Sequence, residues 1–164
     1  MVTGVMSRSW WVQVILQISA LLRDVHATGH VHRDFKPSNV LWIDDKQEWA
    51  MVGFDQAAAA GSVARLSTST LAYTAPEVLA ATCEGDSAMH VSPAIDAWSL
   101  GVVVLELLLA EPAFPPSSGR EEVRHTCRLD RASLHPQWMR RALPNAARRL
   151  ERLRERPEHR GGIA

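Results

Sequence analysis

The residue types best suited to chemistry gather in one short segment, residues 32–39, which reads His-Arg-Asp-Phe-Lys-Pro-Ser-Asn. Phosphoryl transfer needs a carboxylate that orients a hydroxyl and accepts its proton, a positive charge beside the migrating group, and an oxygen ligand for Mg²⁺. The segment offers a residue of each kind, namely Asp34, Lys36 and Asn39. Their types and spacing therefore suit a phosphoryl-transfer loop.

The sequence on either side of this segment predicts the elements that position it. A helix is predicted over Ser9–Thr28, because apolar residues recur at helical spacing at Trp11, Val14, Ile15, Ile18, Leu21, Leu22 and Val25. Gly29 suits the left-handed conformation that often ends a helix. After the segment, Val40–Ile43 and Trp49–Val52 flank a polar turn and predict a β-hairpin.

The remaining pattern predicts a mainly α-helical domain with one small β-hairpin. Residues 56–70 lack hydrophobic periodicity and are expected to form a loop, as is the polar segment Thr82–Ser92. An apolar stretch over Pro93–Ala110 predicts a helix buried through the middle of the domain. Further helices are expected over Pro76–Ala81, Ser118–Arg128 and Asn145–Arg156.

The segment at 32–39, placed between a helix and a hairpin, resembles the catalytic loop of the eukaryotic-type serine/threonine protein kinase family. The resemblance implies that Asp34 is the catalytic base, that Lys36 contacts the phosphoryl group of ATP and that Asn39 binds Mg²⁺. A Lys at position 36 also favours serine and threonine substrates. Arg33 resembles the residue that docks a phosphorylated activation loop.

Three later segments resemble the same family, in the family's order. The segment that ends at Glu77 resembles the end of the activation segment, with Thr70 where the family keeps a threonine facing the catalytic loop. Asp96 begins a segment that resembles the central helix, and the resemblance implies that its carboxylate holds the catalytic-loop backbone. The segment that ends at Arg160 implies a buried ion pair with Glu77, whose disruption would typically cost ~3–5 kcal/mol.

Two departures from the family bear on activity. Where the family has Asp-Phe-Gly after the hairpin, the chain reads Gly53-Phe54-Asp55. Glycine offers no side-chain oxygen to Mg²⁺, and only Asp55, which lies two residues further along an extended chain, could supply a carboxylate instead. The second departure is that no Gly-rich loop or ATP-anchoring Lys precedes Ser9. The chain by itself is therefore expected to be inactive.

These features predict a protein-kinase-like C-terminal lobe over residues 9–160, with tails at 1–8 and 161–164 and without the small N-terminal lobe. Two functions stay open. The first is phosphoryl transfer from ATP, with Mg²⁺, to serine or threonine of a protein. The second is a pseudokinase or truncated kinase that acts as a protein-binding module, which Gly53 favours and the intact loop opposes. An unrelated helical interaction domain would require the ordered motifs to be a coincidence.

Composition constrains the partners less strongly. The formal net charge is zero, and the twelve Arg and six acidic residues of segment 120–160 come without the aromatic or Gly pattern of a nucleic-acid-binding module. The apolar run Trp98–Ala110 is too short for a bilayer, which needs ~20 residues. Cys83 and Cys127 form no CxxC pair and favour free thiols in a reducing compartment. We expect a cytoplasmic protein whose partners are ATP and a protein substrate or regulatory protein, with no nucleic acid and no membrane.

Overall fold

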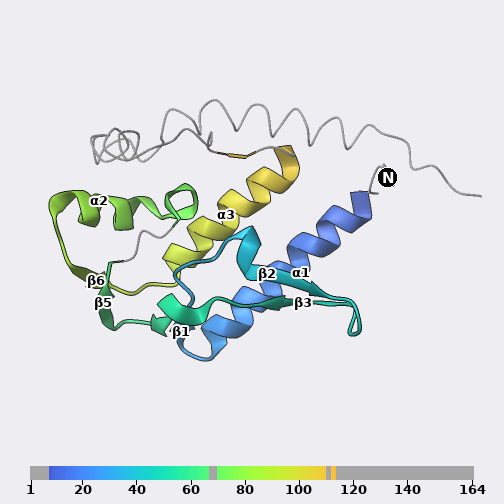
Figure 1. Cartoon of the computed structure of the whole chain (residues 1–164), viewed down its shortest axis with the longest axis horizontal. Coiled ribbons are helices and arrows are strands. Elements are labelled where there is room, and N and C mark those ends of the chain that lie inside the picture. The colour runs from blue at the N-terminus through green and yellow to red at the C-terminus, as the bar shows by residue number, and fades with distance from the viewer. Residues whose placement is uncertain (1–7, 67–69, 110–111, 114–164) are drawn as a thin grey trace, which may run out of the picture.

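The fold is built around two long helices that lie against each other, α1 (Arg8–Ala27) and α3 (Ala94–Leu109) (Figure 1). The computed structural model describes residues 8–66, 70–109 and 112–113. The helix predicted to begin at Ser9 is confirmed, with its start one residue earlier in the chain. Since the two helices come from opposite ends of the described sequence, their contact brings distant residues to one place.

The main hydrophobic core lies between α1, α3 and the loop that follows α1. Its buried members are Val14, Ile18, Leu22, Phe35 and Val103. The α1 residues among them are four positions apart, so they occupy one face of the helix. Burying a large apolar side chain of this kind contributes roughly 1.5–3 kcal/mol. This core fixes the loop through Phe35, which is completely buried.

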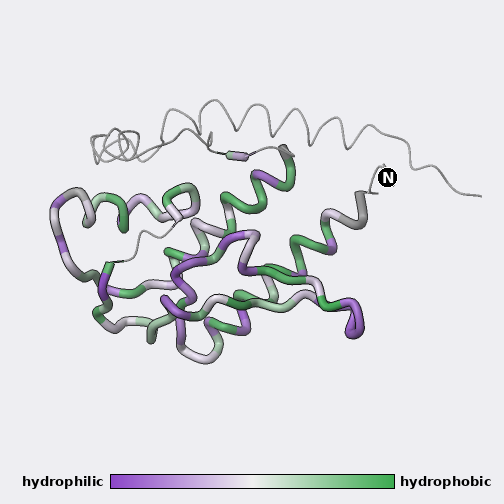
Figure 2. Tube along the Cα trace, in the orientation of Figure 1, coloured by the Kyte–Doolittle hydropathy of each residue, from purple (hydrophilic) through white to green (hydrophobic). Residues whose placement is uncertain are grey.

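The predicted hairpin is present and is formed by β2 (Val40–Ile43) and β3 (Glu48–Met51). Trp42 lies opposite Trp49, and the centroids of their rings are 5.2 Å apart. Figure 2 shows that the turn between the strands is hydrophilic, whereas both strands carry apolar residues. Since β3 contacts α1, the hairpin closes over the helix beside the loop at 32–39.

The expected hairpin is present, but the described residues also form two further two-stranded antiparallel sheets that the sequence did not predict. β1 (His30–Val31) pairs with β4 (Ala58–Ala59), and β5 (Val63–Arg65) pairs with β6 (Ala88–His90). Segments expected to be loops therefore contain strands. These strands are two or three residues long, too short to show alternation in the sequence, and their partners lie far along the chain.

The short helix predicted after Ala75 is α2 (Pro76–Glu84), which runs past its expected end at Ala81. It stops at Gly85, whose φ of 84° is left-handed and suits glycine. On its inner face a second core joins Ala75, Val78 and Ile95. α2 thereby packs onto the start of α3, close to the loop at 32–39.

The central helix α3 is buried on one face and exposed on the other within the described part of the chain. Ile95, Val102 and Val103 are buried, whereas Ala97 and Gly101 are exposed. None of the described helices is long and apolar enough to cross a membrane. The two helices expected beyond Pro116, at 118–128 and 145–156, lie outside the described residues.

Candidate active site

The loop between β1 and β2 is held from below by Asp96 of α3. Asp96 Oδ2 accepts a hydrogen bond from the backbone N–H of His32 and Oδ1 accepts one from that of Arg33, both at 2.7 Å. This expected contact is confirmed, and the Asp96 side chain is fully buried. His26 Nε2 lies 2.8 Å from Asp96 Oδ2. Sequence reasoning missed His26, although it continues the four-residue spacing of the buried face of α1.

His32 packs beneath the loop. Its ring is completely buried, and Nε2 donates to the carbonyl oxygen of Val52 at 2.9 Å. Nδ1 accepts from the backbone N–H of Asp34 at 3.3 Å. The ring of Phe54 lies 4.8 Å away, centroid to centroid. His32 thus ties the loop to the chain that leaves the hairpin.

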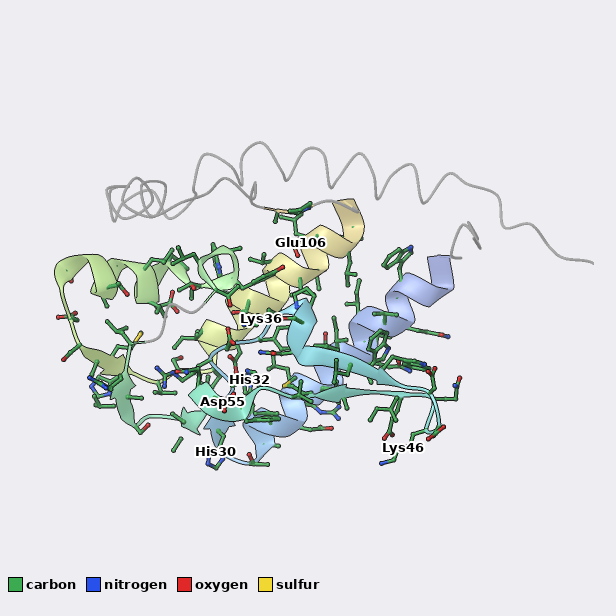
Figure 3. All side chains as sticks on the ribbon, viewed as in Figure 1. His30, His32, Lys36, Lys46, Asp55 and Glu106 are labelled. Carbon is green, nitrogen blue, oxygen red and sulfur yellow. The ribbon has the colours of Figure 1, made fainter. Side chains whose placement is uncertain are left out.

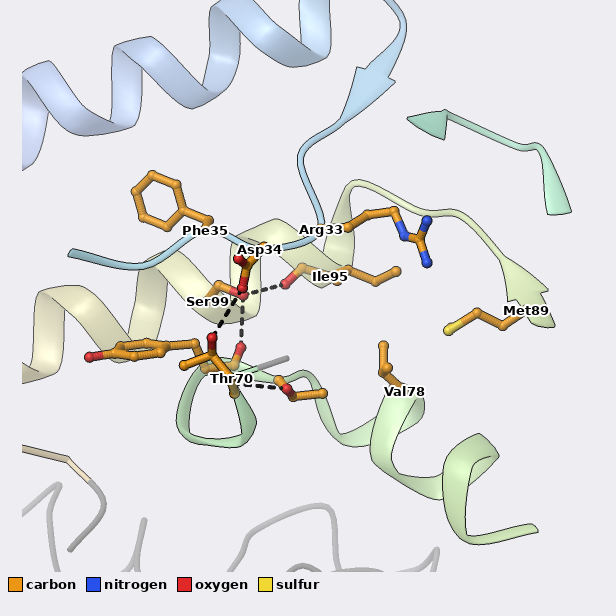
Figure 4. A pocket seen from close by; sticks show the side chains of 10 residues that line it. Arg33, Asp34, Phe35, Thr70, Val78, Met89, Ile95 and Ser99 are labelled. Atoms are coloured by element: carbon orange, nitrogen blue, oxygen red, sulfur yellow. Dashed lines mark hydrogen bonds between the residues drawn. The ribbon is translucent and has the colours of Figure 1, made fainter. Parts of the chain in front are cut away.

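Above this anchor the structure brings together four polar side chains. Lys36 Nζ donates to Asp34 Oδ2 at 2.7 Å and to Thr70 Oγ1 at 2.8 Å. Thr70 Oγ1 in turn donates to Asp34 Oδ1 at 3.3 Å (Figure 4). Asn39 Nδ2 donates to the backbone oxygen of Asp34 at 2.7 Å. The Lys36 and Asp34 side chains are only 19% and 16% exposed, so their ion pair is partly shielded from water.

This cluster can perform the chemistry that the residue types suggest. A carboxylate next to an ammonium group can accept a proton from a hydroxyl held beside it. The same ammonium group can stabilise negative charge that develops nearby. The 3₁₀ turn Pro37–Asn39 places Asn39 on the same side of the loop as Asp34.

Arg33 contacts the segment after the hairpin through backbone oxygens. Its guanidinium donates to the carbonyl oxygen of Gln56 at 3.1 Å and to that of Arg65. Burial lowers the pKa of Arg33 from its usual value, and the negative charge of Asp96 opposes this shift. The docking of a phosphorylated residue by Arg33 stays a prediction. What the structure shows is a guanidinium that ties two parts of the segment to the loop.

The residues around Gly53 do not fit the Mg²⁺ that the family uses. Gly53 has a left-handed φ of 78°, and a Cβ atom added there would lie 2.7 Å from the carboxamide group of Asn39. The space for a side chain at position 53 is therefore filled by Asn39. No group of three or more His, Cys, Asp or Glu residues within the described ranges could hold a metal ion. Asn39 remains as an oxygen ligand without the carboxylate that normally accompanies it.

We predict that Gly53→Ala destabilises the chain more than Gly61→Ala. Both glycines have a left-handed φ, near 80°, but a Cβ at Gly61 would meet nothing within 4 Å. The two variants share backbone strain of roughly 1–2 kcal/mol, and Gly53→Ala must also displace Asn39. Losing the Asn39 hydrogen bond should add about 0.5–1.5 kcal/mol. Urea denaturation measures the difference, and equal losses in the two variants would show that Asn39 does not fill this space.

The other predicted site residues lie apart from the cluster. Asp55 is exposed in the 3₁₀ turn Phe54–Gln56. Glu77 lies in the first turn of α2 and is exposed, so the expected burial of its carboxylate is not found. Arg160, its expected partner, lies outside the described residues. Figure 3 labels Asp55 on the turn that follows β3 and Lys36 on the loop before β2.

A cavity opens beside Asp34, between the loop at 32–39, α2 and α3 (Figure 4). Its lining residues are Arg33, Asp34, Phe35, Thr70, Tyr73, Thr74, Val78, Met89, Ile95 and Ser99. Hydroxyl groups lie on the side of Thr70, and apolar side chains form the side of α2. Because Asp34 and Thr70 both line the cavity, it lies directly beside the cluster of polar side chains.

An anchored loop with this cluster, placed between α1 and a hairpin, is the arrangement of a protein kinase. The protein kinase domain family matches residues 2–155, and the chain belongs to this family. The fold described above is that of a partial kinase domain.

Known relatives agree with this assignment. The chain is 38% identical over 93 residues to the serine/threonine-protein kinase SBK2 of Homo sapiens, covering 56% of this chain and 26% of that protein. It is 31% identical over 124 residues to cyclin-dependent kinase F-3 of Oryza sativa subsp. japonica, covering 76% of this chain and 27% of that protein. The chain thus spans about a quarter of the length of these relatives.

A solved structure has a similar fold. The crystal structure of the yeast RNA Pol II CTD kinase CTDK-1 complex superposes with a TM-score of 0.59 at 26% identity. The match covers 75% of this chain and 38% of that chain. The kinase-like fold is therefore supported by structure as well as by sequence.

Proposed function

We propose that this chain is the large C-terminal lobe of a serine/threonine protein kinase, which transfers a phosphoryl group from ATP to a hydroxyl of a protein substrate. The observation that carries the proposal is the cluster of Asp34, Lys36, Asn39 and Thr70 on a loop anchored by Asp96. The serine/threonine kinase relatives support the same substrate class.

In this proposal the chain's own residues act on the substrate hydroxyl and on the charge that develops. Asp34 orients the hydroxyl and accepts its proton, because its carboxylate lies at the edge of the cavity. Lys36, 2.7 Å from Asp34, balances the negative charge of the phosphoryl group. Asn39 holds the loop in shape through the backbone oxygen of Asp34. ATP supplies the phosphoryl group when it is bound and leaves as ADP, while the hydroxyl proton passes to Asp34.

The partners in this proposal are ATP and a protein substrate or regulatory protein. A protein partner is supported by the CTDK-1 kinase, whose solved structure is a complex. The cytoplasm, where ATP is available, is the proposed location.

A second function, a pseudokinase or kinase fragment that binds proteins, is favoured by the contact between Gly53 and Asn39. The family's metal-binding carboxylate is missing, and the space for it is occupied. Transfer by the chain alone is therefore expected to be very slow, whereas the described helices and sheets can present a binding surface.

A transfer assay decides between the two functions. The chain is joined to the ATP-binding lobe of a serine/threonine kinase, incubated with ATP, Mg²⁺ and a mixture of Ser/Thr and Tyr peptides, and the phosphorylated residues are identified. The first proposal expects phosphoserine or phosphothreonine from the joined protein and none from the chain alone. A joined protein that folds and binds ATP but transfers no phosphoryl group would overturn the first proposal. The second function, a protein-binding module, would then remain.

A further inference from the structure

The chain between α2 and α3 lies beside the segment that follows the hairpin, because β6 pairs with β5 (Figure 1). Backbone bonds extend this pairing beyond both strands. The N–H of Leu66 donates to the carbonyl oxygen of Ser87 at 3.0 Å. The N–H of Val91 donates to the carbonyl oxygen of Ser62 at 2.8 Å. Residues 62–66 are therefore joined to residues 87–91, here called the strap, by a ladder of backbone contacts.

Side chains fix this ladder to the second core, between α2 and α3. Leu66 and Met89, one from each side of the ladder, both pack against this core. Figure 4 shows Met89 reaching from its strand toward the cavity beside Asp34, which it helps to line. Val91, at the end of the strap, is only 2% exposed. The strap is thus held on the domain by buried apolar surface, which favours an ordered position in water.

Arg33 adds a charged contact to the same segment. One terminal nitrogen of its guanidinium donates to the carbonyl oxygen of Arg65, within β5, and the other donates to that of Gln56 at 3.1 Å. An ionised donor makes a stronger hydrogen bond than a neutral one. The segment is thereby held from the loop at 32–39 as well as from the strap, and both terminal nitrogens of Arg33 have an acceptor.

These contacts need no phosphate group. They join backbone groups, apolar side chains and one guanidinium, and none of them uses a side-chain hydroxyl. A phosphorylated residue orders a segment by bringing new charge-assisted hydrogen bonds to an arginine. In this chain a phosphate that docked on Arg33 would first have to displace the backbone oxygens of Gln56 and Arg65.

We propose that the strap holds residues 62–66 in place in the unphosphorylated chain and keeps Arg33 bound to backbone oxygens. A phosphate on this segment is then dispensable for its order. The meaning for regulation rests on the proposed kinase function, because the site beside Asp34 would be available without prior phosphorylation. The strap itself does not rest on that function, since it is a statement about backbone contacts.

The first test measures amide hydrogen exchange by NMR on the full chain, prepared without phosphate as checked by its intact mass. The amides of Leu66 and Val91 report on the two ends of the ladder. Both should exchange at least about tenfold more slowly than in the urea-unfolded chain, because each donates to a carbonyl oxygen of the other segment. Exchange as fast as in the unfolded chain would overturn the proposal.

Met89→Ala removes the apolar anchor of the strap and should raise exchange at Leu66 and Val91 by about tenfold. Met51→Ala is the matched control, because Met51 is also partly buried but packs against the main core. It removes the same side-chain atoms without touching the strap. If both variants raise exchange at these two amides by the same factor, the strap is not held locally and the proposal fails.

Arg33→Met tests the charged contact, since methionine has a long side chain without the donors to Gln56 and Arg65. Exchange at Leu66, which follows Arg65, should rise by about tenfold. Arg23→Met is the matched control, because the side chain of Arg23 is 73% exposed and lies far from the strap in the sequence. Equal exchange at Leu66 in the two variants would contradict the role given to Arg33.

Phosphoserine incorporated at position 67 tests whether a phosphate adds order. Ser67 follows Leu66 in the sequence. Exchange at Leu66 and Val91 should differ by less than about twofold between the modified and unmodified chains, because the ladder is formed in both. Slowing by about tenfold or more would show that the order depends on a phosphate, and would overturn the proposal. These measurements need no phosphate transfer, so their failure is distinguishable from failure of the kinase proposal.

Discussion

Asp34→Asn should lower phosphate transfer by the joined protein by about 10²–10⁴-fold. Asparagine has the shape of aspartate but cannot accept a proton from the substrate hydroxyl. It also leaves Lys36 without the carboxylate that lies 2.7 Å from its ammonium group. The loss should appear mainly in kcat, because the carboxylate acts on the transition state rather than on ATP binding.

Asp45→Asn is the matched control for this prediction, since Asp45 is exposed in the turn of the hairpin. It removes the same charge from the chain without touching the loop at 32–39. Thermal unfolding of both variants checks that they fold. Similar transfer rates for Asp34→Asn and Asp45→Asn would remove Asp34 from the proposed mechanism.

Asp96→Ala is expected to have the largest effect on stability. The substitution leaves the backbone N–H groups of His32 and Arg33 buried without an acceptor, and each such group costs about 1–3 kcal/mol. It also removes the partner of His26. The free energy of unfolding should fall by about 3–5 kcal/mol, as for other buried groups that lose their partner.

Urea denaturation of Asp96→Ala beside Asp45→Ala measures this loss, and Asp45→Ala should stay within about 0.5 kcal/mol of the wild type. Because a marginally stable chain can lose its fold in Asp96→Ala, Asp96→Asn provides a second measurement. Asn keeps one oxygen for one of the two N–H groups and should be destabilised less than Ala. A stability of Asp96→Ala equal to that of Asp45→Ala would show that the loop is not anchored from α3.

The local elements of this fold were predictable because their signals lie in short stretches of sequence. The spacing of apolar residues placed α1, and the two apolar runs around a polar turn placed β2 and β3. The segment at 32–39 predicted a loop whose side chains cluster, and Asp34, Lys36 and Asn39 are indeed brought together. The roles of these residues in catalysis stay predictions.

Features that depend on contacts across the chain were not predictable in the same way. The β5–β6 pair joins segments on either side of α2, and neither strand has enough residues to show alternation. The close approach of Asn39 to Gly53 depends on the left-handed backbone conformation of Gly53. A glycine in the sequence permits this conformation but does not require it, so the contact could not be predicted. The sequence shows His26 only as one more position on the apolar face of a helix. Its contact with the buried carboxylate of Asp96 depends on the packing of α1 against α3 and could not be predicted.

The separation of β5 from β6 along the chain has a consequence for the order in which the molecule assembles. The β2–β3 hairpin closes across a short turn, and such hairpins form in about 1–10 μs. The β5–β6 ladder instead closes a loop that contains α2, and closing a long loop costs entropy before any contact is gained. The segment around Val63–Arg65 should accordingly be the last to acquire protection from solvent during refolding and the first to open again.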